Sequence, residues 1–185
     1  QNLGISMIHQ ELSLIPYLTV GKNVYLGREP KRRIPGFVDW KTLYVQTQEL
    51  LEQLNLEVDP RADVLDLSIA QQQMVEIAKA LSREPDVLIM DEPTDGLDPN
   101  QKFEVRELIK ELGGDRAVVL STHILEEVEA VCTRAIVINK GQIVFDGTPS
   151  EMEGRAPREV TKNRMDHVFR MITTGDVTEA KGGRR

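Results

Sequence analysis

Hydrophobic and polar residues alternate along this chain with the periods of helices and strands, most clearly in its middle part. Ser68 precedes Gln71 by three residues, which is the spacing of a capping box at a helix start. The apolar residues that follow recur at i, i+3, i+4 and i+7 and predict one buried helical face, formed by Met74, Ile77, Ala78 and Leu81. Residues 87–90 are a continuous apolar run, typical of a strand buried on both faces, which ends at Asp91 and Glu92. This stretch therefore predicts a helix, then a strand, then an acidic turn.

The same two periods divide the rest of the chain into elements. Asp39 and Asp98 stand where helix N-caps are expected, and Gly113–Gly114 is expected to end the helix that Asp98 begins. Lys140–Gly141 is expected to be the turn of a β-hairpin. Apolar residues at helical spacing predict a last helix that docks on a core, through Met165, Val168, Phe169 and Ile172. The other expected elements are strands over 3–8, 117–121, 134–139 and 142–146, and helices over 18–27, 40–54 and 124–131.

Composition narrows the class of protein. A chain of 185 residues is long enough for one domain with a sizeable core. Its formal charge of −7 argues against a nucleic-acid partner, whose binding surface is usually basic. The single cysteine, Cys132, excludes an internal disulfide framework and fits a reducing compartment. No apolar run approaches the length of a membrane span, so a link to a membrane is expected to come through a partner.

The two acids at the end of the predicted strand point to phosphate chemistry. A carboxylate in this place can hold Mg²⁺, because Mg²⁺ prefers one or two hard oxygen ligands together with phosphate. We expect Asp91 to take that role and Glu92 to orient or deprotonate a water that attacks a γ-phosphate. The helix start at Ser68 offers a hydroxyl, N–H groups and a positive dipole end, which suit phosphate. Alone, these features read as a turn before Pro93 and an ordinary helix cap; their combination and order favour a nucleotide site.

Four short segments together resemble the motifs of ATP-binding-cassette (ABC) ATPases. They are LSIAQ at 67–71, IMDEPT at 89–94, GLDPN at 96–100 and STH at 121–123. The resemblance covers roughly residues 1–150 and implies an α/β fold of the P-loop NTPase type, with a parallel sheet flanked by helices. It also implies ATP and Mg²⁺ as ligands. The signature segment departs from the family pattern LSGGQ, because Ile69 and Ala70 stand in place of both glycines.

The resemblance implies a role for each motif residue. Glu92 resembles the catalytic glutamate and His123 the switch histidine. Asp91 resembles the metal-binding aspartate of the Walker B strand, and Gln10 the Q-loop glutamine that contacts the metal or its water. The residues implied to bind nucleotide are Gln10, Ser68, Ala70, Gln71 and Asp98.

The phosphate-cradling Walker A loop, G-x-x-x-x-G-K-[ST], does not occur in this sequence. The only Gly-Lys pair is Gly21–Lys22, where Asn23 follows and Pro16 takes the place of the required earlier glycine. The chain therefore resembles a cassette without its N-terminal strands and phosphate loop. Such a chain could offer its signature segment to a partner cassette while being poor at its own site.

The expected domains follow from this resemblance. Residues 1–150 are expected to be a partial ABC ATPase domain, which contains a helical signature subdomain over 12–84. Residues 151–185 are expected to be an extension with one amphipathic helix and a disordered tail. Within the chain, residues 1–94 resemble the first cassette of carbohydrate importers of the ribose, xylose and galactose type, whereas residues 96–173 resemble export-type and gliding-motility cassettes.

The resemblance thus implies an ATP-hydrolysing subunit, or a fragment of one, of an ABC transporter for carbohydrate import or an export-type substrate. The implied partners are transmembrane permease subunits and a second cassette, identical or different, at the cytoplasmic face of the cell membrane. One alternative is a non-catalytic remnant that contributes only a signature half-site. A soluble ABC ATPase of DNA maintenance is less favoured, because the sequence has neither long heptads nor paired cysteines.

Overall fold

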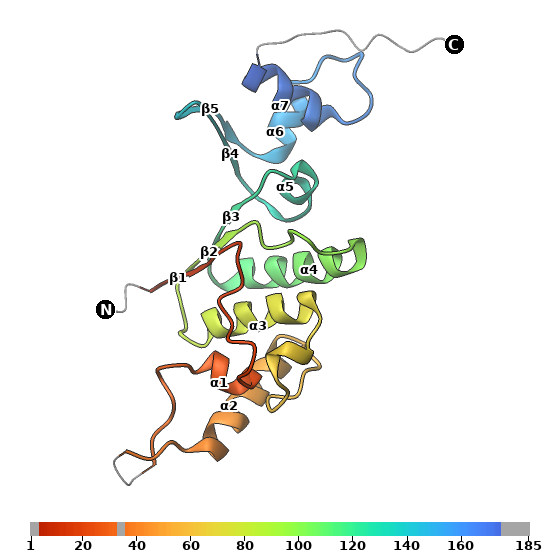
Figure 1. Ribbon diagram of the computed structural model, residues 1–185. Coiled ribbons are helices and arrows are strands. Elements are labelled where there is room, and N and C mark those ends of the chain that lie inside the picture. Colours follow the sequence, from red (N-terminus) through yellow and green to blue (C-terminus); the bar gives the residue numbers. More distant parts are fainter. Residues whose placement is uncertain (1–3, 33–35, 175–185) are drawn as a thin grey trace. The chain divides into compact units, whose positions relative to one another are not determined.

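The computed structural model describes residues 4–32 and 36–174, which form two compact units (Figure 1). The first unit ends at Thr122 and the second begins at His123. The domain boundary predicted at residue 150 stays a prediction.

The first unit is built on three parallel strands in the order β1-β2-β3. Their bounds are Ile5–Ile8 for β1, Val87–Asp91 for β2 and Ala117–Ser121 for β3. In register, Ile8 lies beside Met90, and Asp91 lies beside Ser121. Because parallel strands end at the same edge of a sheet, the residues that follow β1 and β2 meet there. This is the α/β arrangement that the sequence predicts.

One face of this sheet is packed and the other is open. Ile8, Leu88 and Met90 are buried against helices α3 (Ile69–Leu81) and α4 (Pro99–Asp115), which lie beside each other (Figure 1). On the opposite face, the exposed large apolar side chains of β1 and β3 are Ile5 at 56%, Met7 at 50% and Val119 at 52%. The prediction that β2 is buried on both faces is therefore wrong for the described residues. Its side chains alternate between full and partial burial, because α3 and α4 cover one face of the sheet.

Helix α3 begins at the predicted capping box but buries more than the predicted face. The Oγ atom of Ser68 accepts a hydrogen bond from the N–H of Gln71, whose side chain accepts in turn from the N–H of Ser68. Met74, which the pattern assigned to the buried face, is only half-buried, whereas Val75 and Glu76 are buried. The reason is that α3 packs against three elements, β1, α1 (Val20–Val24) and α4, so burial extends around the helix.

The segment between β1 and α3 is mostly helices and loops, as predicted. Its elements are α1, α2 (Trp40–Gln53) and the short 3₁₀ helix η1 (Val64–Asp66). Asp39 caps α2 through the N–H of Thr42. The helix predicted over 18–27 is shorter, since Thr19 caps α1 and the Leu18 carbonyl accepts from Val64 and the Asn23 amide instead of continuing a helix.

Helix α4 begins at its predicted cap and runs past its predicted end. Asp98 accepts from the N–H groups of Asn100 and Gln101. The helix then continues through Gly113 and Gly114 to Asp115, so the prediction that the glycines end it is wrong. Glycine stops a helix by adopting a left-handed conformation, and neither glycine has a positive φ here.

The second unit contains a hairpin with helices packed on it. Its elements are α5 (Leu125–Val131), β4 (Ala135–Asn139), β5 (Gln142–Gly147), α6 (Pro149–Gly154) and α7 (Arg164–Thr174). Lys140 and Gly141 have φ values of 50° and 76°, as a two-residue type I′ turn requires, which confirms the predicted hairpin. Met165 and Val168 of α7 are buried in one cluster with Phe145 and Met152, so α7 docks on a core as predicted. The tail predicted to be disordered lies outside the described residues from residue 175 on.

Candidate functional site

The predicted acids lie where β2 leaves the sheet. Asp91 is the last residue of β2, and the backbone turns sharply at Glu92, whose φ is +45°. The N–H of Glu92 donates to the carbonyl of Ser121 at 2.9 Å, and the N–H of Asp95 donates to the carbonyl of Glu92 at 3.1 Å. A non-glycine residue in this conformation costs about 1–3 kcal/mol, and such strain concentrates at functional sites. Because the backbone turns at Glu92, the carboxylates of Asp91 and Glu92 are not arranged as they would be on two successive residues of a continuing strand.

Gln10 is brought to these acids from the neighbouring strand. Its Nε2 atom donates to Oε2 of Glu92 at 3.1 Å and lies 3.4 Å from Oδ2 of Asp95. Gln10 and Glu92 are 82 positions apart in sequence, and they meet because β1 and β2 are parallel neighbours. Asp95 was not predicted as part of this group. The sequence signal for Asp95 is the Asp-Gly pair that follows Asp91 and Glu92, which is typical of a turn. In the structure, the N–H of Gly96 donates to the Asp95 side chain at 3.0 Å.

A second group of polar residues that the sequence analysis missed holds the segment after Gln10. Glu76 is buried on α3, and its Oε1 atom accepts from the N–H of Ser13 at 2.6 Å and from the Ser13 hydroxyl at 2.8 Å. Lys79 donates to the carbonyl and the hydroxyl oxygen of Ser13 at 3.2 and 2.9 Å. These bonds tie the signature helix to a residue three positions beyond Gln10. The sequence signal for this contact was Glu76, a charged residue among the apolar positions of the predicted helix.

The signature residues occupy the start of α3, with Ser68 exposed and Ala70 buried. The N–H of Gln71, one of the predicted phosphate donors, is already bonded to Ser68 Oγ at 3.3 Å. It can reach a phosphate only after the Ser68 hydroxyl turns away. Ile69, in place of a glycine, is 57% exposed and stands beside Ser68.

The remaining predicted residues are placed separately. Asp98 is the N-cap of α4, and its carboxylate accepts hydrogen bonds from two backbone N–H groups at 2.9 and 3.0 Å. His123 begins the second unit, and its role as the switch histidine stays a prediction. Gly21–Lys22, rejected as a phosphate loop from its spacing, lies in α1, with Lys22 Nζ 5.3 Å from the centroid of the Trp40 ring.

The residues predicted to hold Mg²⁺ have suitable chemistry. Asp91 supplies a carboxylate at the sheet edge, and the Gln10 side chain, held at the same edge, carries an amide oxygen besides the nitrogen bonded to Glu92. In residues 4–32 and 36–174, no group of three or more His, Cys, Asp or Glu side chains is arranged to hold a metal ion. Within the same residues, no helix combines the length and apolar character needed to cross a bilayer.

The parallel sheet, its flanking helices and the acids at its carboxyl edge define the α/β fold of an ABC-type ATPase. The chain belongs to the ABC transporter family, because the family model of that description matches residues 1–95.

Relatives and solved structures agree with this family. A Burkholderia lata ATP-binding protein named for ribose/galactose/methyl galactoside import is 40% identical over 177 residues, which are 95% of this chain and 31% of that protein. A similarly named Rhizobium etli protein is 38% identical over 177 residues, 95% of this chain and 32% of its own length. The cbiO1 structure from Clostridium perfringens, part of the ABC transporter complex cbiONQ, has a TM-score of 0.68 at 26% identity and covers 82% of this chain and 60% of its own. This chain therefore spans about a third of the length of the curated relatives it matches.

Proposed function

We propose that this chain is part of the ATP-binding subunit of an ABC transporter of the sugar-import type. The family model supports the ABC assignment, and the names of the two import relatives support the substrate class. The relatives align beyond residue 95, whereas the family model ends there. The proposed change of character near residue 95, from importer-like to export-like, stays a prediction.

The hydrogen bond between Gln10 and Glu92 is the single observation that carries the proposal. It joins the end of one strand to the acid after the next, at the edge where parallel sheets bind ligands. In the proposed mechanism, Glu92 takes a proton from the water that attacks the γ-phosphate, and Gln10 orients the Glu92 carboxylate. Asp91 and Gln10 would hold Mg²⁺, which supplies charge neutralisation on the phosphates when bound. His123 would contact the γ-phosphate.

The signature segment is proposed to act on a second cassette. Ser68 and the first N–H groups of α3 form an exposed helix start, which suits the phosphates of a nucleotide held by a partner. Asp98, at the start of α4, would lie at the same cassette interface.

The helical part of the first unit is proposed to face permease subunits, which would place the chain at the inner face of the membrane. Exposed aromatic residues support this, because such residues are enriched in protein interfaces. They are Tyr17, Phe37 and Trp40.

Glu92→Gln in the full-length cassette protein that contains this chain, assembled with its permease, tests the proposal. Removing the base is expected to lower the ATP hydrolysis rate by about 10²–10⁴-fold while ATP binding is retained. The matched control is Glu104→Gln, an equal change on the exposed surface of α4, for which the rate should stay within about twofold of wild type. A Glu92→Gln protein that hydrolyses ATP within a few-fold of wild type would show that Glu92 is not the base.

A further inference from the structure

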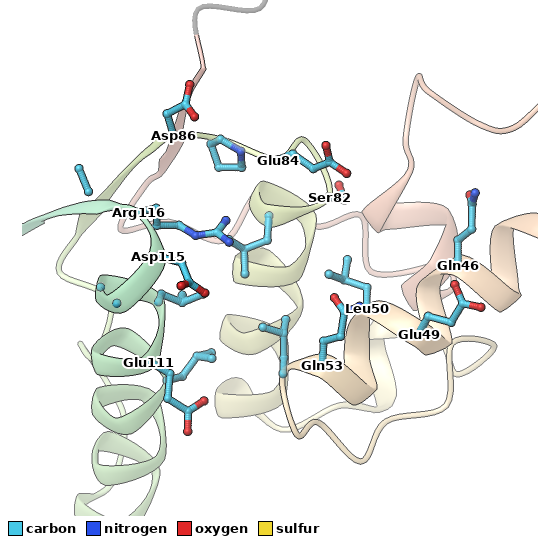
Figure 2. Close-up of a pocket in the computed structure, with 18 of the residues that line it drawn as sticks. Gln46, Glu49, Leu50, Gln53, Ser82, Glu84, Asp86, Glu111, Asp115 and Arg116 are labelled. Carbon is cyan, nitrogen blue, oxygen red and sulfur yellow. The ribbon is translucent and has the colours of Figure 1, made fainter.

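A large groove lies in the first unit away from the sheet edge that holds the predicted site. Its volume is about 1180 Å³, and its walls are the second half of α2, the end of α3 and the second half of α4 (Figure 2). In its lining, Asp86 precedes the first residue of β2 and Ala117 is the first residue of β3, whereas Glu92 follows the last residue of β2. At about 3.3 Å per residue, the length of β2 puts the groove roughly 15 Å from the acids.

The rim of this groove is strongly acidic. Its lining holds five carboxylates and one guanidinium, that of Arg116. The carboxylates are those of Glu49, Glu84, Asp86, Glu111 and Asp115. Arg28, whose guanidinium donates to the carbonyl and hydroxyl oxygens of Ser82 at 3.1 and 2.6 Å, adds a second positive charge near the rim, and the five carboxylates still outnumber these two guanidinium groups. A cationic partner is therefore favoured electrostatically over an anionic one.

The surroundings of Tyr25, which lines the groove, reflect the same charges. Burial raises the pKa of Tyr25, Arg28 opposes this, and the carboxylates of Glu49 and Glu84 raise the pKa further.

The groove also contains a polar atom without a partner. Arg116 follows the last residue of α4, and its side chain lies beside the end of α3 (Figure 2). Its Nε atom is buried, and no hydrogen bond to it exists within the part of the chain that the structure describes. Because this atom is not exposed, a docked partner cannot reach it, and Arg116 counts only as one positive charge in the lining.

The volume of the groove is enough for a short piece of helix. A helix with side chains is about 10–12 Å across and rises 5.4 Å per turn, so roughly two turns fill about 1000 Å³. Gly113 and Gly114, in the last turn of α4, carry no side chain, and an added Cβ on either would meet nothing within 4 Å. The lining also includes apolar side chains between the acids, among them half-buried Leu50 and buried Leu54 and Leu81. A helix could therefore approach α4 closely and set an apolar side chain on this floor.

We propose that this groove docks a basic amphipathic helix of a partner protein, with lysine or arginine side chains against the acidic rim. The mode is the helix-in-groove recognition used by many regulatory peptides. It requires no nucleotide and does not depend on the proposed ATPase function.

Fluorescence anisotropy of the 185-residue chain with a labelled probe peptide tests the proposal. The probe is a helix of about four turns, roughly 14 residues, with leucine on one face and lysine on the other; a second probe carries glutamate in place of lysine. The groove variant is Glu49→Lys/Glu111→Lys. The control variant is Glu52→Lys/Glu104→Lys, which reverses two exposed charges on the same two helices outside the groove lining. The two variants have the same net charge, so non-specific attraction is equal, and circular dichroism verifies that both fold.

The lysine probe is expected to bind the wild-type chain and the control variant equally, and the groove variant at least about tenfold more weakly. The glutamate probe should not bind. Equal affinity of the lysine probe for both variants, equal binding of the two probes, or no binding to the wild-type chain would each overturn the proposal.

Discussion

At the scale of single residues, one buried carboxylate connects the signature helix to the Gln10 segment. Glu76 lies 6% exposed on α3 and accepts two hydrogen bonds from Ser13, while Lys79 donates to the same serine and lies 3.9 Å from the carboxylate. A buried charge is tolerated only when it is hydrogen-bonded and paired, and this one is both. The position of Gln10 relative to α3 therefore depends on it.

Glu76→Ala is expected to lower the free energy of unfolding by about 1–3 kcal/mol, because the N–H and hydroxyl of Ser13 lose their acceptor in a partly buried place. Urea unfolding followed by circular dichroism measures this. Glu104→Ala, on the exposed surface of α4, should change stability by less than about 0.5 kcal/mol. If the two substitutions had the same effect, the contact with Ser13 would contribute nothing to stability.

At the scale of elements, helix α4 shows how a local stop signal is overridden. Gly113 and Gly114 favour a helix end, yet the helix continues for one more residue. Leu108, Ile109 and Leu112 of the same helix are buried. Because most helix stability in proteins comes from packing an apolar face, such burial outweighs the cost of two glycines, which is about 1 kcal/mol each relative to alanine.

Gly113→Ala is therefore expected to stabilise the chain by about 0.5–1 kcal/mol, since alanine favours the helix and its methyl group meets no neighbour. The thermal or urea midpoint should rise accordingly. Gly27→Ala is the contrasting variant: an added Cβ there also meets nothing, but the φ of +74° strains alanine, so this change should destabilise. A Gly113→Ala midpoint below that of wild type would show that α4 ends before the glycines in solution.

At the scale of the whole molecule, the open face of the three-stranded sheet in the first unit exposes apolar side chains. Ile5, Met7 and Val119 are each half or more exposed, and the register of the strands puts all three on the same face. Contiguous apolar surface of this kind promotes association.

Sedimentation velocity of the chain at increasing concentration should show self-association, and Met7→Lys/Val119→Lys should reduce it because lysines keep an open sheet face solvated. Tyr17→Lys, which places a charge on an exposed aromatic residue outside the sheet, should leave the association unchanged. A monomeric wild-type chain at every concentration would contradict the prediction.

The chain by itself should also bind nucleotide weakly. The backbone N–H row and lysine of a phosphate loop do not occur in its sequence, and its net charge of −7 disfavours a polyanion. Calorimetric titration with Mg-ATP should give a Kd of about 1 mM or weaker, near −4 kcal/mol. Micromolar binding would show that another segment holds the phosphates, and it would also count against the alternative of a remnant that offers only its signature half.

The features that the sequence determined by itself are those set by residues within a few positions of each other. The capping box at Ser68, the helix cap at Asp98 and the turn at Lys140–Gly141 were predicted because their hydrogen bonds and backbone angles involve near neighbours. The order of motifs was likewise enough to identify the family, which the comparisons confirm.

Only the tertiary structure decided the features that join distant parts of the chain. Gln10 meets Glu92 across 82 positions because β1 and β2 lie in parallel register. The sequence close to Glu92 does not indicate which distant side chain Glu92 contacts. The same holds for the bond between Ser13 and Glu76 and for the continuation of α4 past Gly113. In each case the deciding energy is burial against another element, which depends on where the chain folds back and not on the spacing of residues along it.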